Sequence, residues 1–469
     1  MLILRQITPA YVKLIFSTVF FLLVSSQSFT QLQNQGTSLL SQKDEHGNGY
    51  SACWGYTAPN GREYAILGCN TGTAFIDITD TTNINEVAFV TGVTSGWREM
   101  KVFSNYAYVV SEGTNSRLQI MDLQNLPTSV TLVNTYSYTG YTRTHSISQS
   151  GPYLYLNGGN NTSGGSNSGG VTILDLTGSP VNPVKRGSWS NQYVHDCRIV
   201  NDTIYACNIY NPPGTISVIN AINKDALATV NSWQNNPNPF PHNCDLPPDR
   251  RYIYTTDETS SPNGKLKVWN KSNLSNVTLV TTWQPTGITT AIVHNVEIYG
   301  NIAVVAHYTA GIRVLDITNP TAPLEIAWYD TYPSSNSSSF SGCWGVFRFP
   351  SGKIIGSDIS GGLFVIKLTN PPTGINNNQN VPSAFSLKQN YPNPFNPSTT
   401  IEYSIPRNSF VTVRVFDAVG KQVGLLADEF KYAGNYKINY DAGRLASGVY
   451  YYSILADGYK ETRKMILIK

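Results

Sequence analysis

Four histidines are spaced almost evenly through the middle of the chain. His145, His195, His242 and His294 follow one another at steps of 50, 47 and 52 residues. Imidazole is a frequent metal ligand, and together with carboxylates it suits a divalent transition metal, whereas carboxylates with amide oxygens suit calcium. Side chains this far apart in the sequence can converge if a repeated structural unit places each of them at the same phase.

The histidines mark one phase of a repeat that occurs seven times. Each copy reads as three strands separated by turns, as in residues 294–319, and the third strands end at Asp77, Asp122, Asp175, Asn220, Asn270, Asp316 and Lys367. Repeats of 45 to 53 residues with three or four short strands are typical of β-propeller blades. At the histidine phase, the other three copies carry Trp54, Trp97 and Trp344.

The segment that precedes the first repeat is expected to complete the last one. Residues 37–44 resemble the fourth strand of another copy, residues 323–330, whereas the last copy runs into residues 369–372 without a fourth strand. Pairing of these segments would close the ring and remove two open sheet edges. The sequence therefore predicts an all-β protein, a seven-bladed β-propeller over residues 31–370 that is closed by an N-terminal strand.

The innermost strands of a propeller surround its axis, so residues at the start of these strands should form a ring at one axial mouth. Because the second strand runs back antiparallel, its end lies beside the start of the first. We expect the mouth to collect the four histidines and these further side chains: Trp54, Trp97, Arg98, Glu112, Asp196, Asp257, Glu258, His307 and Asp358.

The mouth has a functional and a structural interpretation. It could bind a polar ligand or a divalent metal, calcium or an ion of the zinc type, with at most three neighbouring histidines as ligands. Alternatively, each histidine bonds the backbone of the next blade and the tryptophans plug the channel. The repeated Asp is interpreted as turn structure, because Asp or Asn after a strand can accept bonds from the next turn.

No sequence motif supports a named reaction. The chain contains no GxSxG, no HExxH and no phosphate-binding glycine loop. A hydrolase built on a central metal would need an acid or base such as Asp196, Glu258 or His307 near its substrate. We therefore expect a binding scaffold for a glycan, peptide or protein, with a metal-dependent hydrolase as the alternative.

The N-terminus predicts export. Residues 1–30 carry two basic residues, then an apolar run from Leu14 to Val24, then small polar residues, as a secretory signal peptide does. A membrane anchor is the alternative, but the run is short for a spanning helix, and no later segment could span a bilayer. Removing residues 1–30 deletes two positive charges and no negative ones, so the net charge falls from +3 to +1. A net charge this close to zero does not indicate a nucleic-acid-binding surface.

The six cysteines are an even number, which suits disulfides in an oxidising compartment. Cys197 and Cys207 are equidistant from the centre of a predicted hairpin, so they could face each other across two strands. Cys53 and Cys69 are placed similarly in the first repeat. The sequence suggests no partner for Cys244 or Cys343, and no CxxC pattern points to zinc.

The composition changes after the repeats. Residues 371–384 are polar and rich in proline and asparagine, and they are expected to be a linker. Residues 385–469 contain no cysteine and carry alternating runs such as Phe410–Phe416 and Gly448–Leu455. These runs predict a small antiparallel sandwich of the immunoglobulin-like type.

The C-terminal segment resembles the type A sorting domain of the type IX secretion system. The resemblance covers residues 385–469 and rests on Asn390-Tyr391-Pro392-Asn393-Pro394-Phe395-Asn396-Pro397, on Val415–Gly420, on Ala446–Tyr451 and on Lys464–Lys469. It implies an origin in Bacteroidota or their relatives, passage across the inner membrane on the signal peptide, and recognition of the tail by the type IX machinery. It also implies attachment at the cell surface or release. An adhesive module is the alternative.

The repeats resemble those of the choice-of-anchor B proteins, which are named for a Leu-Val-Ile-Val-Asp phrase. Val314-Leu315-Asp316-Ile317-Thr318-Asn319-Pro320 fits that phrase, and Trp54-Gly55 and His294-Asn295 fit the start of its inner strand. The copies with Asn220, Asn270 and Lys367 depart from it. The resemblance implies a propeller and an exported location, and it assigns no activity to the chain.

Overall fold

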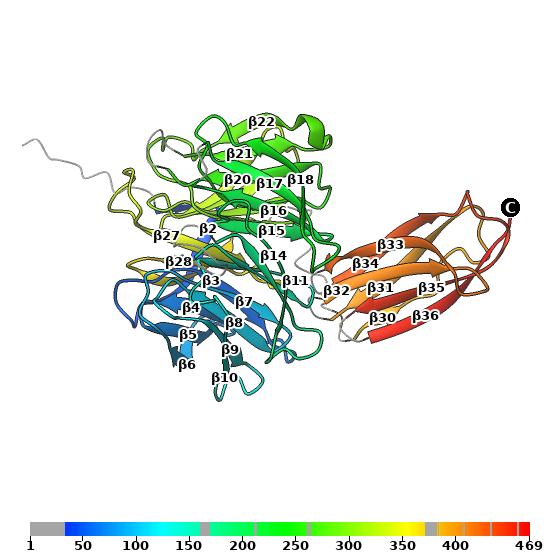
Figure 1. Ribbon diagram of the computed structural model, residues 1–469, viewed down its shortest axis with the longest axis horizontal. Helices are drawn as coiled ribbons and strands as arrows, with labels where there is room; N and C mark the ends of the chain where they lie inside the picture. The colour runs from blue at the N-terminus through cyan, green and yellow to red at the C-terminus, as the bar shows by residue number, and fades with distance from the viewer. Residues whose placement is uncertain are drawn as a thin grey trace, which may run out of the picture. The chain divides into compact units, whose positions relative to one another are not determined.

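The computed structural model describes residues 33–159, 169–210, 213–259, 264–370, 382, 384–406, 409–431, 434–456 and 459–469. The predicted signal peptide (1–30) and all but residues 382 and 384 of the predicted linker (371–384) lie outside this part. The described residues form seven sheets of a propeller and two sheets of a sandwich (Figure 1). Their one helix is the 3-10 turn η1 (Leu274–Asn276).

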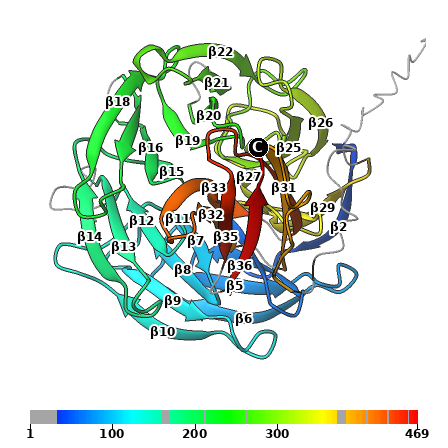
Figure 2. The same ribbon diagram turned by 90° about the vertical axis from the view of Figure 1, so that its right-hand side faces the viewer.

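Each blade is an antiparallel sheet, and the blades follow one another around a ring (Figure 2). The blades contain the following strands: in blade 1, β3 (Cys53–Thr57), β4 (Glu63–Cys69), β5 (Gly72–Asp77) and β6 (Asn85–Thr91); in blade 2, β7 (Arg98–Phe103), β8 (Tyr106–Ser111), β9 (Leu118–Asp122) and β10 (Thr131–Tyr136); in blade 3, β11 (Ser146–Ser150), β12 (Tyr153–Asn157), β13 (Val171–Asp175) and β14 (Val184–Trp189); in blade 4, β15 (Asp196–Val200), β16 (Thr203–Asn208), β17 (Thr215–Asn220) and β18 (Ala228–Gln234); in blade 5, β19 (Pro241–Asp245), β20 (Tyr252–Asp257), β21 (Leu266–Asn270) and β22 (Thr278–Trp283); in blade 6, β23 (Val296–Tyr299), β24 (Ile302–Ala306), β25 (Ile312–Asp316) and β26 (Leu324–Tyr329); and in blade 7, β27 (Cys343–Arg348), β28 (Ile354–Asp358) and β29 (Gly362–Leu368).

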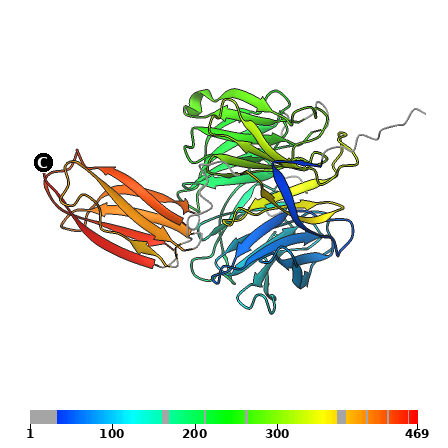
Figure 3. The same cartoon turned by 180° about the vertical axis from the view of Figure 1, so that it is seen from behind.

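The N-terminal segment closes the ring, as predicted. Strand β2 (Thr37–Lys43) pairs antiparallel with β29 from Thr37–Leu368 to Lys43–Leu363 and supplies the fourth strand of blade 7 (Figure 3). The preceding strand β1 (Asn34–Gln35), which the sequence did not predict, pairs with β26 of blade 6. One continuous segment therefore links the last two blades by backbone hydrogen bonds, and both edges are covered.

The propeller core lies between neighbouring blades. Seven apolar clusters are found in the described part of the propeller, and each joins side chains of two adjacent sheets. The second and third strands are buried on both faces, which explains why they read as continuous apolar runs such as Ile302–Ala306. The fourth strands are more exposed, as in β10, in which no residue is buried.

The repeated Asp is turn structure, as predicted. In six blades its side-chain oxygen accepts a hydrogen bond from the backbone N–H two residues later, at 2.8–3.0 Å; the residues are Asp77, Asp122, Asp175, Asn220, Asn270 and Asp316. Asn preserves this bond, which explains its presence in blades 4 and 5. The third strand runs parallel to the first, so this turn lies on the face away from the predicted mouth.

The C-terminal segment is a two-sheet antiparallel sandwich. One sheet has the order β30 (Ser386–Leu387), β31 (Ser398–Ile405), β34 (Gly434–Asp441); the other has the order β33 (Gln422–Lys431), β32 (Ser409–Phe416), β35 (Gly448–Ala456), β36 (Tyr459–Leu467). Strand β35 alternates strictly, with Tyr450, Tyr452 and Ile454 in the core and Tyr451 and Leu455 exposed. This is the period of two expected for a sheet with one buried face.

Neither predicted disulfide is formed, because all six cysteines are buried free thiols. In the hairpin of blade 4, Asp196 faces Cys207 and Cys197 faces Ala206. Adjacent residues of a strand point to opposite faces, so Cys197 and Cys207 lie in different apolar clusters on the two sides of the blade. Cys53 faces Leu67, two residues short of Cys69. Symmetry about a hairpin was therefore a misleading signal.

Candidate functional site

The inner strands of four adjacent blades bring the four histidines into one row. His145 and His195 directly precede β11 and β15, His242 lies in β19, and His294 lies two residues before β23. The ring centroids of successive histidines are 3.9, 4.2 and 4.3 Å apart. Spacings of 47 to 52 residues in the sequence thus become direct ring contacts.

Two tryptophans extend the row over two further blades. The ring of Trp344 lies 4.9 Å from His294, and the ring of Trp97 lies 6.2 Å from Trp344. His242 and Trp344 each interrupt the register of their strand pair, which is the sign of a β-bulge. Bulges re-aim side chains, and here both bulged residues join the row. We call these six residues, together with Glu112 and Glu258, the axial mouth.

Hydrogen bonds to the backbone fix the orientation of two imidazoles. Nδ1 of His242 donates to the carbonyl oxygen of His294 at 3.1 Å, and Nδ1 of His294 donates to that of Trp344. A carbonyl oxygen can only accept, so the ring proton sits on Nδ1 and Nε2 carries a lone pair. Burial lowers the pKa of both rings to about 3, and they are neutral at pH 7.

His145 differs from the other members of the row because it pairs with a carboxylate. Its Nδ1 lies 2.8 Å from Oε1 of Glu112. Burial acts to lower the pKa of His145, but the hydrogen bond and the charge of Glu112 outweigh burial and raise it. The row therefore ends in a His–Glu dyad in direct contact with His195.

Glu258 faces the row from the end of the second strand of blade 5. Its Oε2 lies 3.5 Å from Nε2 of His242, and its Oε1 lies 3.7 Å from Nε2 of His294. The hydroxyl of Tyr308 donates to Oε1 at 2.5 Å. His195, His242 and Glu258 each offer one atom to a set whose members lie within 4.8 Å of one another, the one such triad in the described part.

Tyr308 was missed by the sequence analysis, and its backbone is unusual. Its φ of +31° lies outside the ordinary region for a bulky side chain. Strained residues of this kind gather at functional sites, where the surrounding structure holds them in place. The aromatic ring is buried against His294, at 4.7 Å between centroids.

Trp54 and Arg98 do not line the mouth, contrary to prediction. Pairing in blade 1 extends back to Ser51, so Trp54 lies within its strand, and its side chain lines a cavity inside the channel. Arg98 is buried between blades 1 and 2, where its guanidinium donates to the carbonyl oxygens of Cys69 and Val93 at 3.1 and 2.7 Å.

Three residues from second-strand ends also point away from the mouth. Asp257 is fully buried beside Lys267, and Asp358 accepts bonds from backbone N–H groups of its own turn. His307 is buried, with its ring 6.1 Å from that of Trp283. Successive residues of a strand alternate between faces, so Glu258 reaches the mouth while its neighbour Asp257 does not.

Asp196 lines a separate cavity of about 50 Å³ inside the channel, which we call the axial cavity. Lys101 lies 2.8 Å from Glu99, and Arg198 lies 3.0 Å from Asp245 and 2.9 Å from Glu297. The sequence analysis missed this charged layer. The available signal was the presence of charged residues within the inner strands, such as Glu99, Arg198 and Glu297.

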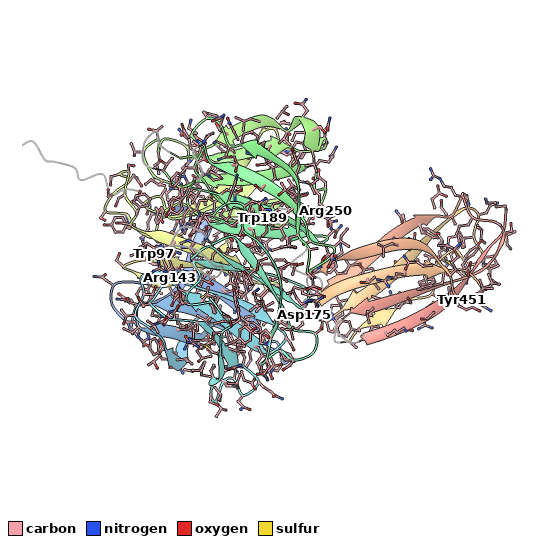
Figure 4. All side chains as sticks on the ribbon, viewed as in Figure 1. Trp97, Arg143, Asp175, Trp189, Arg250 and Tyr451 are labelled. Atoms are coloured by element: carbon pink, nitrogen blue, oxygen red, sulfur yellow. The ribbon has the colours of Figure 1, made fainter. Side chains whose placement is uncertain are left out.

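Figure 4 shows the two faces of the propeller. Trp97 and Arg143 lie on one side of it, and Asp175, at the end of β13, lies on the other. Arg143 belongs to the mouth side, since its guanidinium approaches the carbonyl oxygen of Glu112 at 3.5 Å. The polar row and the repeated Asp turns are therefore on opposite faces.

Comparison with protein families identifies two segments of the chain. Residues 389–469 match the secretion system C-terminal sorting domain, and residues 292–331 match the LVIVD repeat. The sorting domain shows that the protein is exported by type IX secretion to the cell surface or beyond. The described residues include no helix long and apolar enough to cross a membrane. No curated protein matches the sequence.

Solved structures match the chain at low identity and with TM-scores below 0.5. PorZ of Porphyromonas gingivalis, described as a bacterial surface component of the type IX secretion system, is 12% identical with a TM-score of 0.41. That match covers 92% of this chain but only 59% of PorZ. Sqt1 of Chaetomium thermophilum is 8% identical with a TM-score of 0.48, over 70% of this chain and 98% of Sqt1. A Lactobacillus plantarum protein is 11% identical with a TM-score of 0.48, over 79% and 96%.

Proposed function

We propose that this exported propeller, which carries an LVIVD repeat and a type IX sorting domain, binds an extracellular ligand at its axial mouth. The observation that carries the proposal is the row of six rings supplied by blades 2 to 7, in which Trp344 and Trp97 meet across blade 1, flanked by Glu112 and Glu258. A structural plug would explain the bonds of His242 and His294 to the backbone of the next blade, but it would not explain the two carboxylates beside the row. The row places two neutral imidazoles with their Nε2 atoms toward the carboxylate of Glu258, and burying such groups costs free energy.

Exposed aromatic side chains surround the row. Trp97 is 48% exposed, Tyr210 is 52% exposed, and Phe340 is 53% exposed. Phe340 packs on Tyr308 at 5.6 Å, and Tyr210 packs on Tyr193 at 4.9 Å, so both are connected to the mouth. Exposed aromatic rings next to polar groups favour ligands that have an apolar face and a polar edge.

A carbohydrate fits this combination best. The apolar face of a sugar ring can stack on an aromatic ring, while its hydroxyl groups can donate to carboxylates. A peptide or a folded protein could use the same aromatic side chains. The binding screen should therefore include glycans first and peptides second.

The test is a binding screen with the full exported chain, followed by affinity measurements on Trp97→Ala and Tyr210→Ala. Each should weaken binding at least about tenfold, which corresponds to about 1.4 kcal/mol. Tyr451→Ala is the matched control, because Tyr451 is a 38% exposed tyrosine of the sandwich (Figure 4). Binding that is unchanged in both mouth variants would refute the proposal.

A metal-dependent hydrolase is the second candidate, and the dyad of His145 and Glu112 favours it. A raised imidazole pKa suits a proton donor, and the contact with His195 places the dyad beside the triad that could hold a metal. Chromogenic esters and phosphate esters, assayed with added Zn²⁺, test this reading. Hydrolysis that depends on Glu112 would support it, and wild-type rates in Glu112→Gln would exclude the dyad.

A further inference from the structure

We infer that the axial mouth holds one divalent metal ion of the zinc type, bound by Nε2 of His242, a ring nitrogen of His195 and the carboxylate of Glu258. The inference rests on the proposed function, since the ion would form part of the ligand-binding surface. It commits to a transition metal where the sequence left calcium open, because imidazole nitrogen suits zinc and calcium takes oxygen ligands.

The first argument concerns two acceptors that face each other. Nε2 of His242 carries a lone pair, because the ring proton is used by the bond from Nδ1 to the carbonyl oxygen of His294. This lone pair faces Oε2 of Glu258 at 3.5 Å, beyond the 2.7 to 3.2 Å of a hydrogen bond. Two acceptors at this separation repel each other, and a cation between them turns the repulsion into attraction.

The same arrangement recurs at the second oxygen of Glu258. Nε2 of His294 faces Oε1 at 3.7 Å, and Nδ1 of His294 is bonded to the carbonyl oxygen of Trp344. One carboxylate therefore meets the lone pairs of two neutral imidazoles.

The distances suit a tetrahedral ion. Zinc–nitrogen and zinc–oxygen bonds of about 2.1 Å place neighbouring ligand atoms about 3.4 Å apart. The His242–Glu258 separation of 3.5 Å already has this value, and all three ligand atoms lie within 4.8 Å of one another. Three protein ligands leave one position for water or for a bound ligand, as in open zinc sites.

A second shell of hydrogen bonds is also in place. Metal-binding histidines usually donate their other N–H to a carbonyl or a carboxylate, and His242 does so. Tyr308 holds Glu258 through a hydrogen bond of 2.5 Å, and it does so from a strained backbone conformation. The strain at Tyr308 is explained if its task is to orient a ligand of the ion.

The test is calorimetric titration of the chelator-treated full chain with Zn²⁺. We expect one equivalent to bind, with affinity reduced at least about 100-fold in His242→Ala and in the isosteric Glu258→Gln, and about tenfold in Tyr308→Phe. His46→Ala is the matched control, because His46 also pairs with a carboxylate, Glu86, at 2.7 Å but lies outside the triad. Circular dichroism confirms that each variant is folded.

Two results overturn the inference: no stoichiometric binding by the wild type, or equal binding by folded Glu258→Gln. The ligand screen with Trp97→Ala, run with and without Zn²⁺, separates this failure from failure of the proposed function. A ligand that binds the metal-free chain through Trp97 keeps the proposed function while the metal inference falls. If the chain binds Zn²⁺ but no molecule of the ligand screen, the metal inference stands and the proposed function falls.

Discussion

Lys267→Met should be among the most destabilising single substitutions in the propeller. Lys267 and Asp257 are 1% and 0% exposed, and Nζ of Lys267 lies 2.7 Å from Oδ2 of Asp257. The same ammonium donates to the carbonyl oxygens of Asn235 and Pro237, and to that of Asn238 at 3.1 Å. Its three N–H groups are thus shared among one carboxylate of blade 5 and three carbonyls of the connection from blade 4 to blade 5.

Methionine retains most of the side-chain volume and removes every one of these donors. Breaking a buried ion pair by removal of one partner costs about 3–5 kcal/mol. Burial already raises the pKa of Asp257 to about 7, so without Lys267 the carboxyl must stay charged without compensation or take up a proton. Chemical denaturation monitored by tryptophan fluorescence measures the loss. Lys265→Met, two residues earlier and half-buried, is the control and should cost less than about 1 kcal/mol.

A double variant isolates the charge from the packing. Lys267→Met combined with Asp257→Asn leaves no uncompensated charge, so it should recover part of the lost stability, with a coupling of at least about 1 kcal/mol. A single variant within about 1 kcal/mol of the wild type, or strictly additive effects, would refute the reasoning. Because Asp257 precedes Glu258, the single variant should also weaken zinc binding at the mouth.

Three further predictions concern the turns and the thiols. Asp316→Ala should cost about 1 kcal/mol in unfolding free energy and Asp316→Asn should cost less than half of that, since Asn makes the same turn bond in two other blades; equal losses would contradict the turn assignment. Burial opposes the lowered pKa of Asp77, but hydrogen bonds from Thr79 and Arg62 outweigh it. The folded-state pKa of Asp77 is then below that of the unfolded chain, so the stability that Asp77 contributes is complete above about pH 4 and is lost at lower pH. In denaturation experiments, the difference in unfolding free energy between wild type and Asp77→Ala should therefore shrink as the pH falls from 5 to 2. A difference that stays constant over this range would contradict the prediction. Iodoacetamide should label none of the six buried cysteines in the native chain and all six after denaturation without reductant, by intact mass, and four labels would reveal a disulfide.

The repeat made most of the fold predictable. Strand order, blade number and the closing strand follow from the spacing of apolar runs and from the unpaired edges that this spacing would leave. The turn role of Asp316 was also predictable, because Asp at a strand end has one obvious set of bonding partners. These features depend on backbone geometry that every blade shares.

The composition of the mouth was only partly predictable. The sequence identified the four histidines. The prediction that Trp54 takes the same position in blade 1 was wrong, because strand pairing begins earlier in that blade. The sequence also did not show that Glu258 lies at the mouth and Asp257 does not. The side chains of adjacent strand residues point to opposite faces, and the sequence does not say which of the two faces the mouth. Bulges at His242 and Trp344 shift the register locally, and no residue type marks them in advance.

The most direct test of the axial mouth is a crystal of the full chain grown with Zn²⁺ and measured at the zinc absorption edge. We predict one anomalous peak about 2.0–2.2 Å from ligand atoms of His195, His242 and Glu258. A map without a peak at the mouth, or with zinc only at surface sites such as His46, would contradict the account.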